Sequence, residues 1–195
     1  FNKPSSFSVH SGTNTGYGLI DVIRKFRKDF ERLDLLHRLD KETSGCIIIT
    51  KSYESLKIFQ KKIKNKEINK KYLCLVKGRW NAKIKKSTHK LTRDSKTVDA
   101  ETHFKVIKYY KNSTLLEAEL ITGRYHQIRK HCEMLNHPII GDKKYGDRAL
   151  NKLYKERGLS RIFLHASRIK FYLNKEIIVE CPLPKELESF LINHN

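Results

Sequence analysis

The spacing of apolar residues predicts two helices in the first third of the chain. The first covers residues 19–30, with basic residues opposite its apolar side. The second begins after Ser52, whose hydroxyl suits an N-cap. The apolar positions are Leu19, Ile20, Ile23, Phe26 and Phe30 in the first helix and Leu56, Phe59 and Ile63 in the second.

Short runs that are β-branched or alternate in hydrophobicity predict strands. Polar turns at residues 111–113 and 174–175 join the last four of these runs into two hairpins. Ile107 and Tyr109 shift the apolar positions to the other face near the end of one run, and Gly78 stops another. The runs cover residues 46–49, 72–76, 102–109, 116–120, 162–172 and 177–181.

The order of these elements indicates the fold class. Residues 126–135 form a further short helical pattern, and Pro184 opens a terminal helix. Strands interrupted by short helices, with hairpins late in the chain, predict an α+β fold on a mainly antiparallel mixed sheet. We expect one domain over residues 1–195, because no repeat or break in composition divides them. Residues 1–4 read like the end of a strand, so we expect that an upstream segment was removed.

The charge of the chain points to a polyanionic partner. Its 195 residues include 41 Lys and Arg against 21 Asp and Glu, which gives a net charge of +20. Residues 51–96 alone hold 16 Lys and Arg and 3 Asp and Glu. Nucleic acid is the usual partner of such a domain, although a compositional bias toward lysine is an alternative explanation. A membrane surface is less favoured, because the lysines do not line one long amphipathic helix, and no apolar run is long enough for a span.

The four cysteines give no sign of a disulfide framework or a metal site. Cys46, Cys74, Cys132 and Cys181 form no Cys-x-x-Cys pair and lie in apolar surroundings. We therefore expect buried thiols in a reducing cytoplasm.

The first cluster of candidate chemistry is residues 37–45, which precede a predicted buried strand. A loop that leads into such a strand is a rigid mount for an active group. Asp40 lies in this loop between Arg38 and Lys41, and we expect these cations to favour its ionised form. The alternative is an aspartate that caps a turn and pairs with arginine.

The second cluster is residues 123–131, where Gly123 ends a strand and a helix begins at once. Arg129 follows His126 by three residues, so both side chains can project from one face of the helix. The helix N-terminus beside Arg124 suits an anion. A basic surface helix is the alternative.

The third cluster, Lys70-Lys71-Tyr72, opens a predicted strand. An aromatic ring after two lysines can stack on a base while the ammonium groups hold phosphate. A tyrosine packed in the core is the alternative.

Together these clusters resemble the RluA family of pseudouridine synthases. Matching elements occur in order along nearly the whole chain, with Tyr125 where the family usually has Thr and Ser6 where a Gly is common. The elements are His37-Arg38-Leu39-Asp40-Lys41 with Thr43-Ser44-Gly45, Lys71-Tyr72-Leu73 with Val76 and Gly78, Gly123-Arg124 with His126-Gln127-Ile128-Arg129, His137-Pro138-Ile139 with Gly141-Asp142, Tyr145-Gly146-Asp147, Phe163-Leu164-His165-Ala166 and Pro182-Leu183-Pro184.

The resemblance implies a pseudouridine synthase catalytic fold that isomerises uridine in RNA, with no metal and no organic cofactor. The base must first leave its stack. Asp40 resembles the essential carboxylate, and three roles suit it: attack on the sugar, attack on the base, or removal of a sugar proton. Arg129 resembles the arginine that pairs with this aspartate.

The resemblance also assigns the surroundings of the base. Tyr72 resembles the tyrosine that packs on the uracil and takes part in removing the C5 proton, and Leu164 resembles the apolar residue on the pocket floor. Arg38 resembles the arginine that helps hold the RNA open around the flipped base. Arg124 and His126 are expected to bind the RNA.

Residues 145–148 and 158–166 resemble most the C-type enzymes of the family, which modify 23S ribosomal RNA. We therefore expect large-subunit ribosomal RNA as the partner of a monomeric cytoplasmic enzyme, with an S4-type RNA-binding domain missing upstream.

Three alternatives stay open. One is a member of the family that acts on another ribosomal site or on tRNA, and one is a non-catalytic RNA-binding or ribosome-assembly protein. The third, a metal-dependent hydrolase that uses Asp40 with His37, His126 or His131, lacks a His-Glu-x-x-His pattern and clustered carboxylates.

Overall fold

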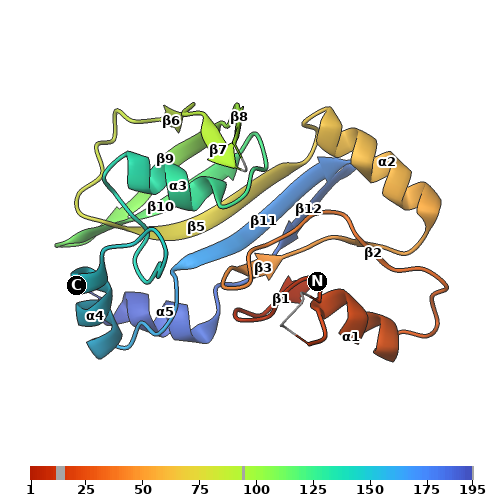
Figure 1. The fold of residues 1–195 in the computed structure, drawn as a ribbon, viewed down its shortest axis with the longest axis horizontal. Coiled ribbons are helices and arrows are strands. Elements are labelled where there is room, and N and C mark those ends of the chain that lie inside the picture. Colours follow the sequence, from red (N-terminus) through yellow and green to blue (C-terminus); the bar gives the residue numbers. More distant parts are fainter. Residues whose placement is uncertain (12–15, 94, 195) are drawn as a thin grey trace.

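A computed structural model describes residues 1–11, 16–93 and 95–194, which form a mixed sheet flanked by helices (Figure 1). The helices are α1 Leu19–Phe26, α2 Tyr53–Lys64, α3 Gln127–Met134, α4 Arg148–Glu156 and α5 Lys185–Ile192. The strands are β1 Asn2–Lys3, β2 Asp34–Leu35, β3 Ser44–Cys46, β4 Ile49–Thr50, β5 Asn69–Lys77, β6 Lys86–Ser87, β7 Leu91–Arg93, β8 Lys96–Val98, β9 Thr102–Tyr109, β10 Ser113–Leu120, β11 Leu164–Tyr172 and β12 Glu176–Glu180.

The main sheet has the strand order β1-β3-β11-β5-β10-β9-β6, and β12 pairs with β11. The long strands β5 and β11 run diagonally through its centre (Figure 1). Only the β3–β11 pair of this sheet is parallel. The prediction of an α+β fold on a mainly antiparallel mixed sheet is therefore confirmed.

Both predicted hairpins are present, as β9–β10 and β11–β12. Leu115 pairs with Lys108 and Leu116 with Val106, so the register skips Ile107. This bulge is the physical origin of the change of face predicted at Ile107.

All four predicted helices are confirmed in type, as α1, α2, α3 and α5. The backbone N–H of Ser55 donates to Ser52 Oγ at 3.1 Å, as expected for the N-cap of α2. Helix α1 ends at Phe26, four residues before the predicted end at Phe30. Helix α4, capped by Asp147, was not predicted from the sequence.

The prediction of one strand over residues 46–49 is wrong, because this run crosses between two sheets. The Ile47 N–H donates to the Phe1 carbonyl at 2.9 Å, which continues the pairing of β1 with β3. The Ile48 carbonyl instead accepts the Leu36 N–H at 3.0 Å, beside the small β2–β4 sheet.

Helices cover the sheet in three places, and each contact buries an apolar cluster. Ile128 and Cys132 of α3 join the central cluster with residues of β5, β10 and β11. Tyr154 of α4 and Phe190 of α5 pack with residues near the start of β11, and Leu56 of α2 packs near its other end. All four cysteines are buried free thiols, as predicted. In the described part of the chain, no helix has the length and apolar character needed to cross a membrane.

Candidate active site

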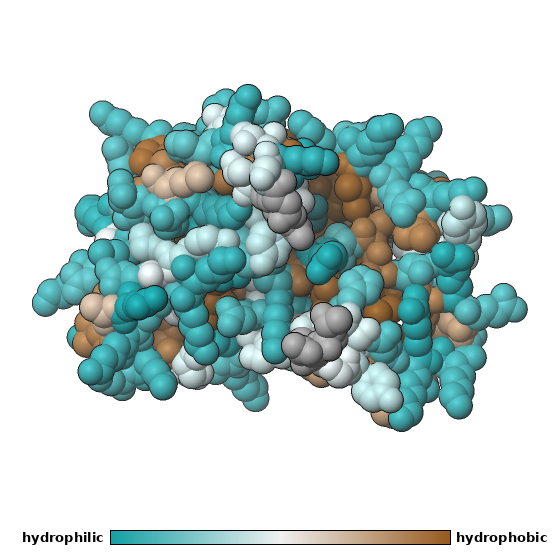
Figure 2. Space-filling model, in the orientation of Figure 1, coloured by the Kyte–Doolittle hydropathy of each residue, from teal (hydrophilic) through white to brown (hydrophobic). Residues whose placement is uncertain are grey.

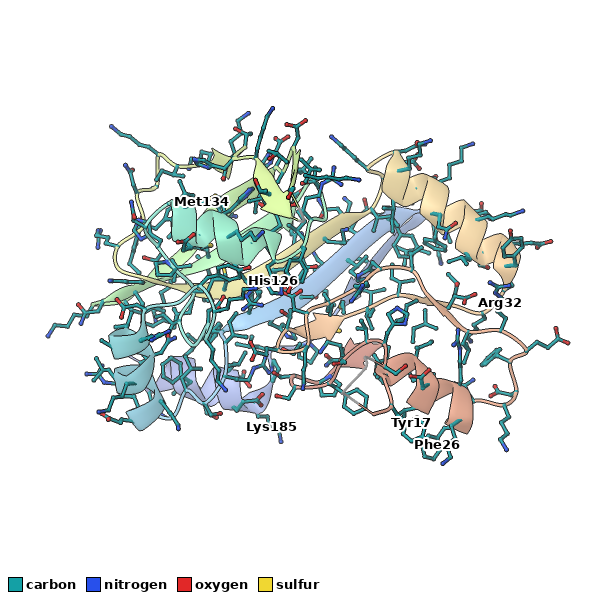
Figure 3. The ribbon with its side chains drawn as sticks, viewed as in Figure 1. Tyr17, Phe26, Arg32, His126, Met134 and Lys185 are labelled. Atoms are coloured by element: carbon teal, nitrogen blue, oxygen red, sulfur yellow. The ribbon has the colours of Figure 1, made fainter. Side chains whose placement is uncertain are left out.

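A cleft of about 980 Å³ opens between the loop before β3, the start of β5, the end of β10 and the start of α3. Figure 2 shows apolar atoms at the bottom of a hollow right of centre, within a mostly hydrophilic surface. His126 lies near the middle of this face (Figure 3). All seven site residues expected from the sequence line the cleft: Arg38, Asp40, Tyr72, Arg124, His126, Arg129 and Leu164.

The loop that carries Asp40 is held from two sides. The Thr43 N–H donates to the Asp40 carbonyl at 3.1 Å and closes a turn. The fully buried Lys3 donates from Nζ to the carbonyls of Pro4, Phe7 and Lys41, at 2.8, 2.9 and 3.1 Å. Burial lowers the pKa of Lys3 to about 8, and Asp40 opposes this effect. Lys3 therefore fastens the Asp40 loop to the N-terminal segment.

Gly45 in β3 brings this loop against β11. Its φ of 113° lies in a region that side chains rarely adopt, and a Cβ there would lie 2.2 Å from the Ala166 carbonyl oxygen. The two strands pair in parallel, with Gly45 opposite Ala166. This close approach brings the Asp40 loop to β11, whose first residue, Leu164, lines the same cleft.

Arg129 and His126 reach Asp40 from the first turn of α3. Arg129 Nη1 lies 3.4 Å from Asp40 Oδ2, and His126 Nε2 lies 3.8 Å from Asp40 Oδ1. His126 precedes the helix with a left-handed φ of 54°. Both side chains therefore face Asp40, but only Arg129 does so from a helix face, because α3 begins at Gln127 and His126 lies outside it.

Asp142 is the partner that sequence reasoning missed. Arg129 donates from Nε and Nη2 to its two carboxylate oxygens, both at 2.7 Å. The Asp142 side chain is fully buried, and its Oδ1 also accepts the backbone N–H groups of Lys144 and Tyr145. Asp142 belongs to the Gly141-Asp142 element of the family resemblance, which was the only sequence signal for it.

The pKa values of the two aspartates are shifted in opposite directions, although burial acts to raise both. Burial raises the pKa of Asp40 above the usual 3.8, although Arg129 opposes it. Burial also acts against ionisation of Asp142, but its hydrogen bonds from Arg129 and Tyr145 outweigh this and lower its pKa. The expectation that Arg38 and Lys41 hold Asp40 ionised is wrong, because the cation that acts most on it is Arg129.

The imidazole of His126 is neutral near neutral pH. Burial, followed by the charge of Arg129, lowers its pKa to about 4. Its Nδ1 lies 3.1 Å from the Tyr145 hydroxyl, and its ring stacks on Tyr125 with centroids 3.6 Å apart. His126 therefore faces Asp40 as a dipole rather than as a cation.

Tyr72 and Leu164 give the cleft an apolar floor, with 5% and 3% of their surfaces exposed. Burial, followed by the charge of Asp40, raises the pKa of Tyr72, so its phenol stays protonated at neutral pH. Arg38 and Arg124 are exposed at the rim, where Arg124 Nε donates to the Asp99 carbonyl at 3.1 Å.

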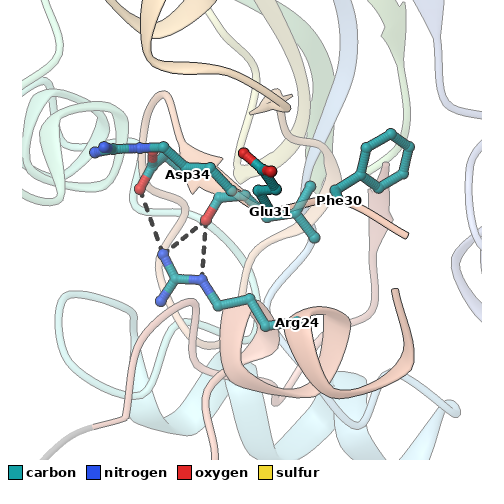
Figure 4. Close-up of a pocket in the computed structure, with 6 residues that line it drawn as sticks. Arg24, Phe30, Glu31 and Asp34 are labelled. Atoms are coloured by element: carbon teal, nitrogen blue, oxygen red, sulfur yellow. Dashed lines mark hydrogen bonds and ion pairs between the residues drawn. The ribbon is translucent and has the colours of Figure 1, made fainter. Parts of the chain in front are cut away.

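A second hollow, of about 380 Å³, contains none of the expected site residues (Figure 4). Arg24 in its wall donates from Nε and Nη2 to the Leu33 carbonyl, at 2.9 and 2.6 Å, and reaches Asp34 at 3.3 Å. Arg32 binds the other oxygen of Asp34. These polar groups bind one another, so their arrangement supports the α1–β2 connection.

The described residues contain no group of three or more His, Cys, Asp or Glu side chains placed to hold a metal ion.

The chain is similar in sequence to known RNA pseudouridylate synthases. Residues 1–134 match the model of the RNA pseudouridylate synthase family, and the chain belongs to that family. It is 36% identical to ribosomal large subunit pseudouridine synthase C of Haemophilus ducreyi, over 97% of this chain and 64% of that protein. The same enzyme of Haemophilus influenzae is 39% identical, over 87% of this chain and 56% of that protein. The chain thus spans less than two thirds of the length of these relatives.

Solved structures agree with the fold. The human RNA pseudouridylate synthase domain containing 4 superposes with a TM-score of 0.77 at 25% identity, over 98% of this chain and 87% of that one. The human RNA pseudouridylate synthase domain containing 1 has a TM-score of 0.74 at 21% identity, over 94% and 78% of the two chains, and this likeness concerns the fold alone.

Proposed function

We propose that this chain isomerises uridine to pseudouridine in large-subunit ribosomal RNA, as a monomeric cytoplasmic enzyme. The observation that carries the proposal is Asp40, a partly buried carboxylate 3.4 Å from Arg129 in a cleft floored by Tyr72 and Leu164. The names of the C-type relatives support the choice of ribosomal RNA.

The reaction is an isomerisation that needs no external reactant. The N1–C1′ bond of the flipped uridine breaks, the uracil turns, C5 bonds to C1′, and the C5 proton leaves as N1 regains one. An ionised Asp40 beside C1′ can attack the sugar, attack the base or remove a sugar proton. Arg129 lies 3.4 Å from that carboxylate and orients it, and the bonds of Arg129 to Asp142 keep the guanidinium in place.

The cleft also has to retain the detached uracil. Tyr72 and Leu164 present apolar surface to the ring and exclude water from it. Arg38 and Arg124 at the rim suit the opened RNA backbone. Three lysines of the lysine-rich segment 51–96 line the cleft as well, namely Lys64, Lys66 and Lys70, and residue 94 lies outside the described residues. This segment is therefore suited to bind phosphates of the RNA.

Replacement of Asp40 by Asn tests the proposal. Asp40→Asn keeps the size and polarity of the side chain but removes the carboxylate, so pseudouridine formation in a ribosomal RNA transcript should be lost. RNA affinity should stay within about tenfold of wild type, or about 1.4 kcal/mol. The matched control is Asp29→Asn, which changes an exposed aspartate paired with Arg27 and should leave turnover unchanged. Normal turnover by Asp40→Asn would refute the catalytic assignment.

The same assay separates the alternatives. A non-catalytic RNA-binding protein would leave the transcript without pseudouridine even as wild type. A metal-dependent hydrolase would cut the RNA and lose activity in EDTA. Against the latter, His131 Nε2 donates to the His89 carbonyl at 3.1 Å and His37 Nε2 accepts the Ile48 N–H at 3.2 Å, so both rings already have partners. Mapping of pseudouridine in ribosomal RNA and tRNA from cells that lack the gene would identify the target uridine.

A further inference from the structure

Strand β5 sends alternate side chains to opposite faces of the sheet. Lys70 and Tyr72 line the cleft, together with Ile68 just before the strand. Lys71 points to the other face, where its Nζ lies 2.5 Å from Glu117 of β10. The two adjacent lysines, equivalent in the sequence, therefore have different environments.

Lys70 is a cation of the cleft wall without an acidic partner. The residues that line the cleft include seven Lys and Arg but only one acidic residue, Asp40, which is bound by Arg129. Within the described residues, no hydrogen bond or ion pair engages the Lys70 ammonium. Burial alone lowers the pKa of Lys70, with no carboxylate to oppose it.

The position of the ammonium group adds a geometric argument. A Cβ placed on Gly123 would lie 3.6 Å from Lys70 Nζ, so the ammonium lies beside the turn that leads into α3. Lys70 is two residues from Tyr72 along the strand, or about 6.6 Å. Burial of the ammonium without a partner costs free energy, and a bound anion would offset this cost more fully than a neutral group.

We propose that Lys70 binds a backbone phosphate of the RNA next to the nucleotide that packs on Tyr72. This deepens the proposed function, on which it rests, and it distinguishes Lys70 from Lys71 as the phosphate ligand. Lys70 acts by positioning the nucleotide and takes no part in bond making.

Salt titration of RNA binding tests the assignment, with a single-stranded oligouridylate as the probe. Each phosphate contact on a single strand contributes about 0.7 to the slope of log K against log salt. Lys70→Gln should lower the magnitude of this slope by about 0.7, and Lys70→Arg, which keeps the charge, should leave it near the wild-type value. The matched control is Lys71→Gln, which removes the same charge one residue away and should leave the slope unchanged. Thermal unfolding of each variant verifies that it is folded.

The other outcomes would overturn the proposal. Equal slopes for Lys70→Gln and Lys71→Gln would mean that only the general charge matters. Weaker binding by Lys70→Gln at an unchanged slope would place the ammonium on a neutral group, such as a uracil carbonyl. The slopes do not depend on turnover, so a wild-type protein that makes no pseudouridine would refute the proposed function and leave this comparison intact.

Discussion

Two aspartates share the guanidinium of Arg129, and they share it unequally. Asp142 takes two hydrogen bonds of 2.7 Å, whereas Asp40 is 3.4 Å away. The negative charge of Asp142 also raises the pKa of Asp40. Arg129 is therefore fixed mainly by Asp142, which leaves the Asp40 carboxylate only loosely held and accessible from the cleft.

This arrangement predicts that Asp142→Asn lowers both stability and activity. The substitution leaves Arg129 buried without its main counter-ion, and breaking a buried ion pair costs about 3–5 kcal/mol. The loss of unfolding free energy should lie near the lower end of this range, because Asn Oδ1 can still accept the N–H groups of Lys144 and Tyr145. Urea unfolding measures the stability and pseudouridine formation the activity.

The pH dependence gives a second readout of the same variant. Because the folded protein lowers the pKa of Asp142, its stabilising contribution is fully present above the usual aspartate value and is lost as pH falls below it. The difference between wild type and Asp142→Asn should thus be large at pH 7 and shrink in strong acid. The control Asp147→Asn removes an exposed ion pair with Lys77 but keeps the N-cap of α4, because Asn Oδ1 can still accept the Leu150 N–H, so it should cost less than about 1 kcal/mol. Equal losses for the two variants would contradict the role given to Asp142.

The sequence predicted the residues whose side chains have a recognisable catalytic or binding chemistry. It did not predict the residues that act by positioning another side chain. Asp40, Arg129 and Tyr72 lie in clusters with recognisable chemistry, and all three line the cleft. Asp142 and Lys3 are far from Asp40 in sequence, and only the fold reveals that they hold the site. Charge reasoning from sequence neighbours failed at Asp40 for the same reason, since desolvation and Arg129 dominate there.

Among the elements, the parallel contact of β3 with β11 does most to place the site. It brings the Asp40 loop onto the strand that carries Leu164, and it depends on the absence of a side chain at Gly45. The sequence did not indicate this contact, because residues 46–49 read as one buried strand. Helix α4 was not predicted, although Leu150, Leu153 and Tyr154 follow the N-cap Asp147 at helical spacing.

The contact predicts that Gly45→Ala is more harmful than an ordinary glycine substitution. Its Cβ would overlap the Ala166 carbonyl, so stability should fall and turnover should drop as the Asp40 loop shifts. The control is Gly158→Ala, where φ is also positive, at 96°, but nothing lies within 4 Å of the new Cβ. The free energy of unfolding of that variant should fall only by the cost of backbone strain, about 1–2 kcal/mol, and its activity should be unchanged. Gly45→Ala should lose about 1–3 kcal/mol more through overpacking, which urea unfolding can measure. Equal losses of stability in the two variants, with normal turnover by Gly45→Ala, would mean that β3 and β11 can move apart without a loss of free energy.

At the scale of the whole molecule, we expect RNA binding to depend both on the net charge of +20 and on where the lysines lie relative to the cleft. Lys64 and Lys66 are exposed at the cleft, near the end of α2. Lys152 and Lys155 are exposed on α4, outside the residues that line it. Removal of either pair lowers the net charge to +18, so the two changes are equal in overall electrostatics and differ only in position.

If RNA lies along the cleft, the double variant Lys64→Gln/Lys66→Gln should lower the slope of log K against log salt by about 1.4, as expected for two single-strand phosphate contacts. The double variant Lys152→Gln/Lys155→Gln should change the slope little, because these two lysines do not line the cleft. Salt largely screens the interaction of exposed charges that are more than about 10 Å apart. Binding of a ribosomal RNA transcript between about 50 and 200 mM salt measures both. Equal reductions would show that the molecule attracts RNA through its total charge, and the cleft would then select the uridine only after a contact made anywhere on the surface.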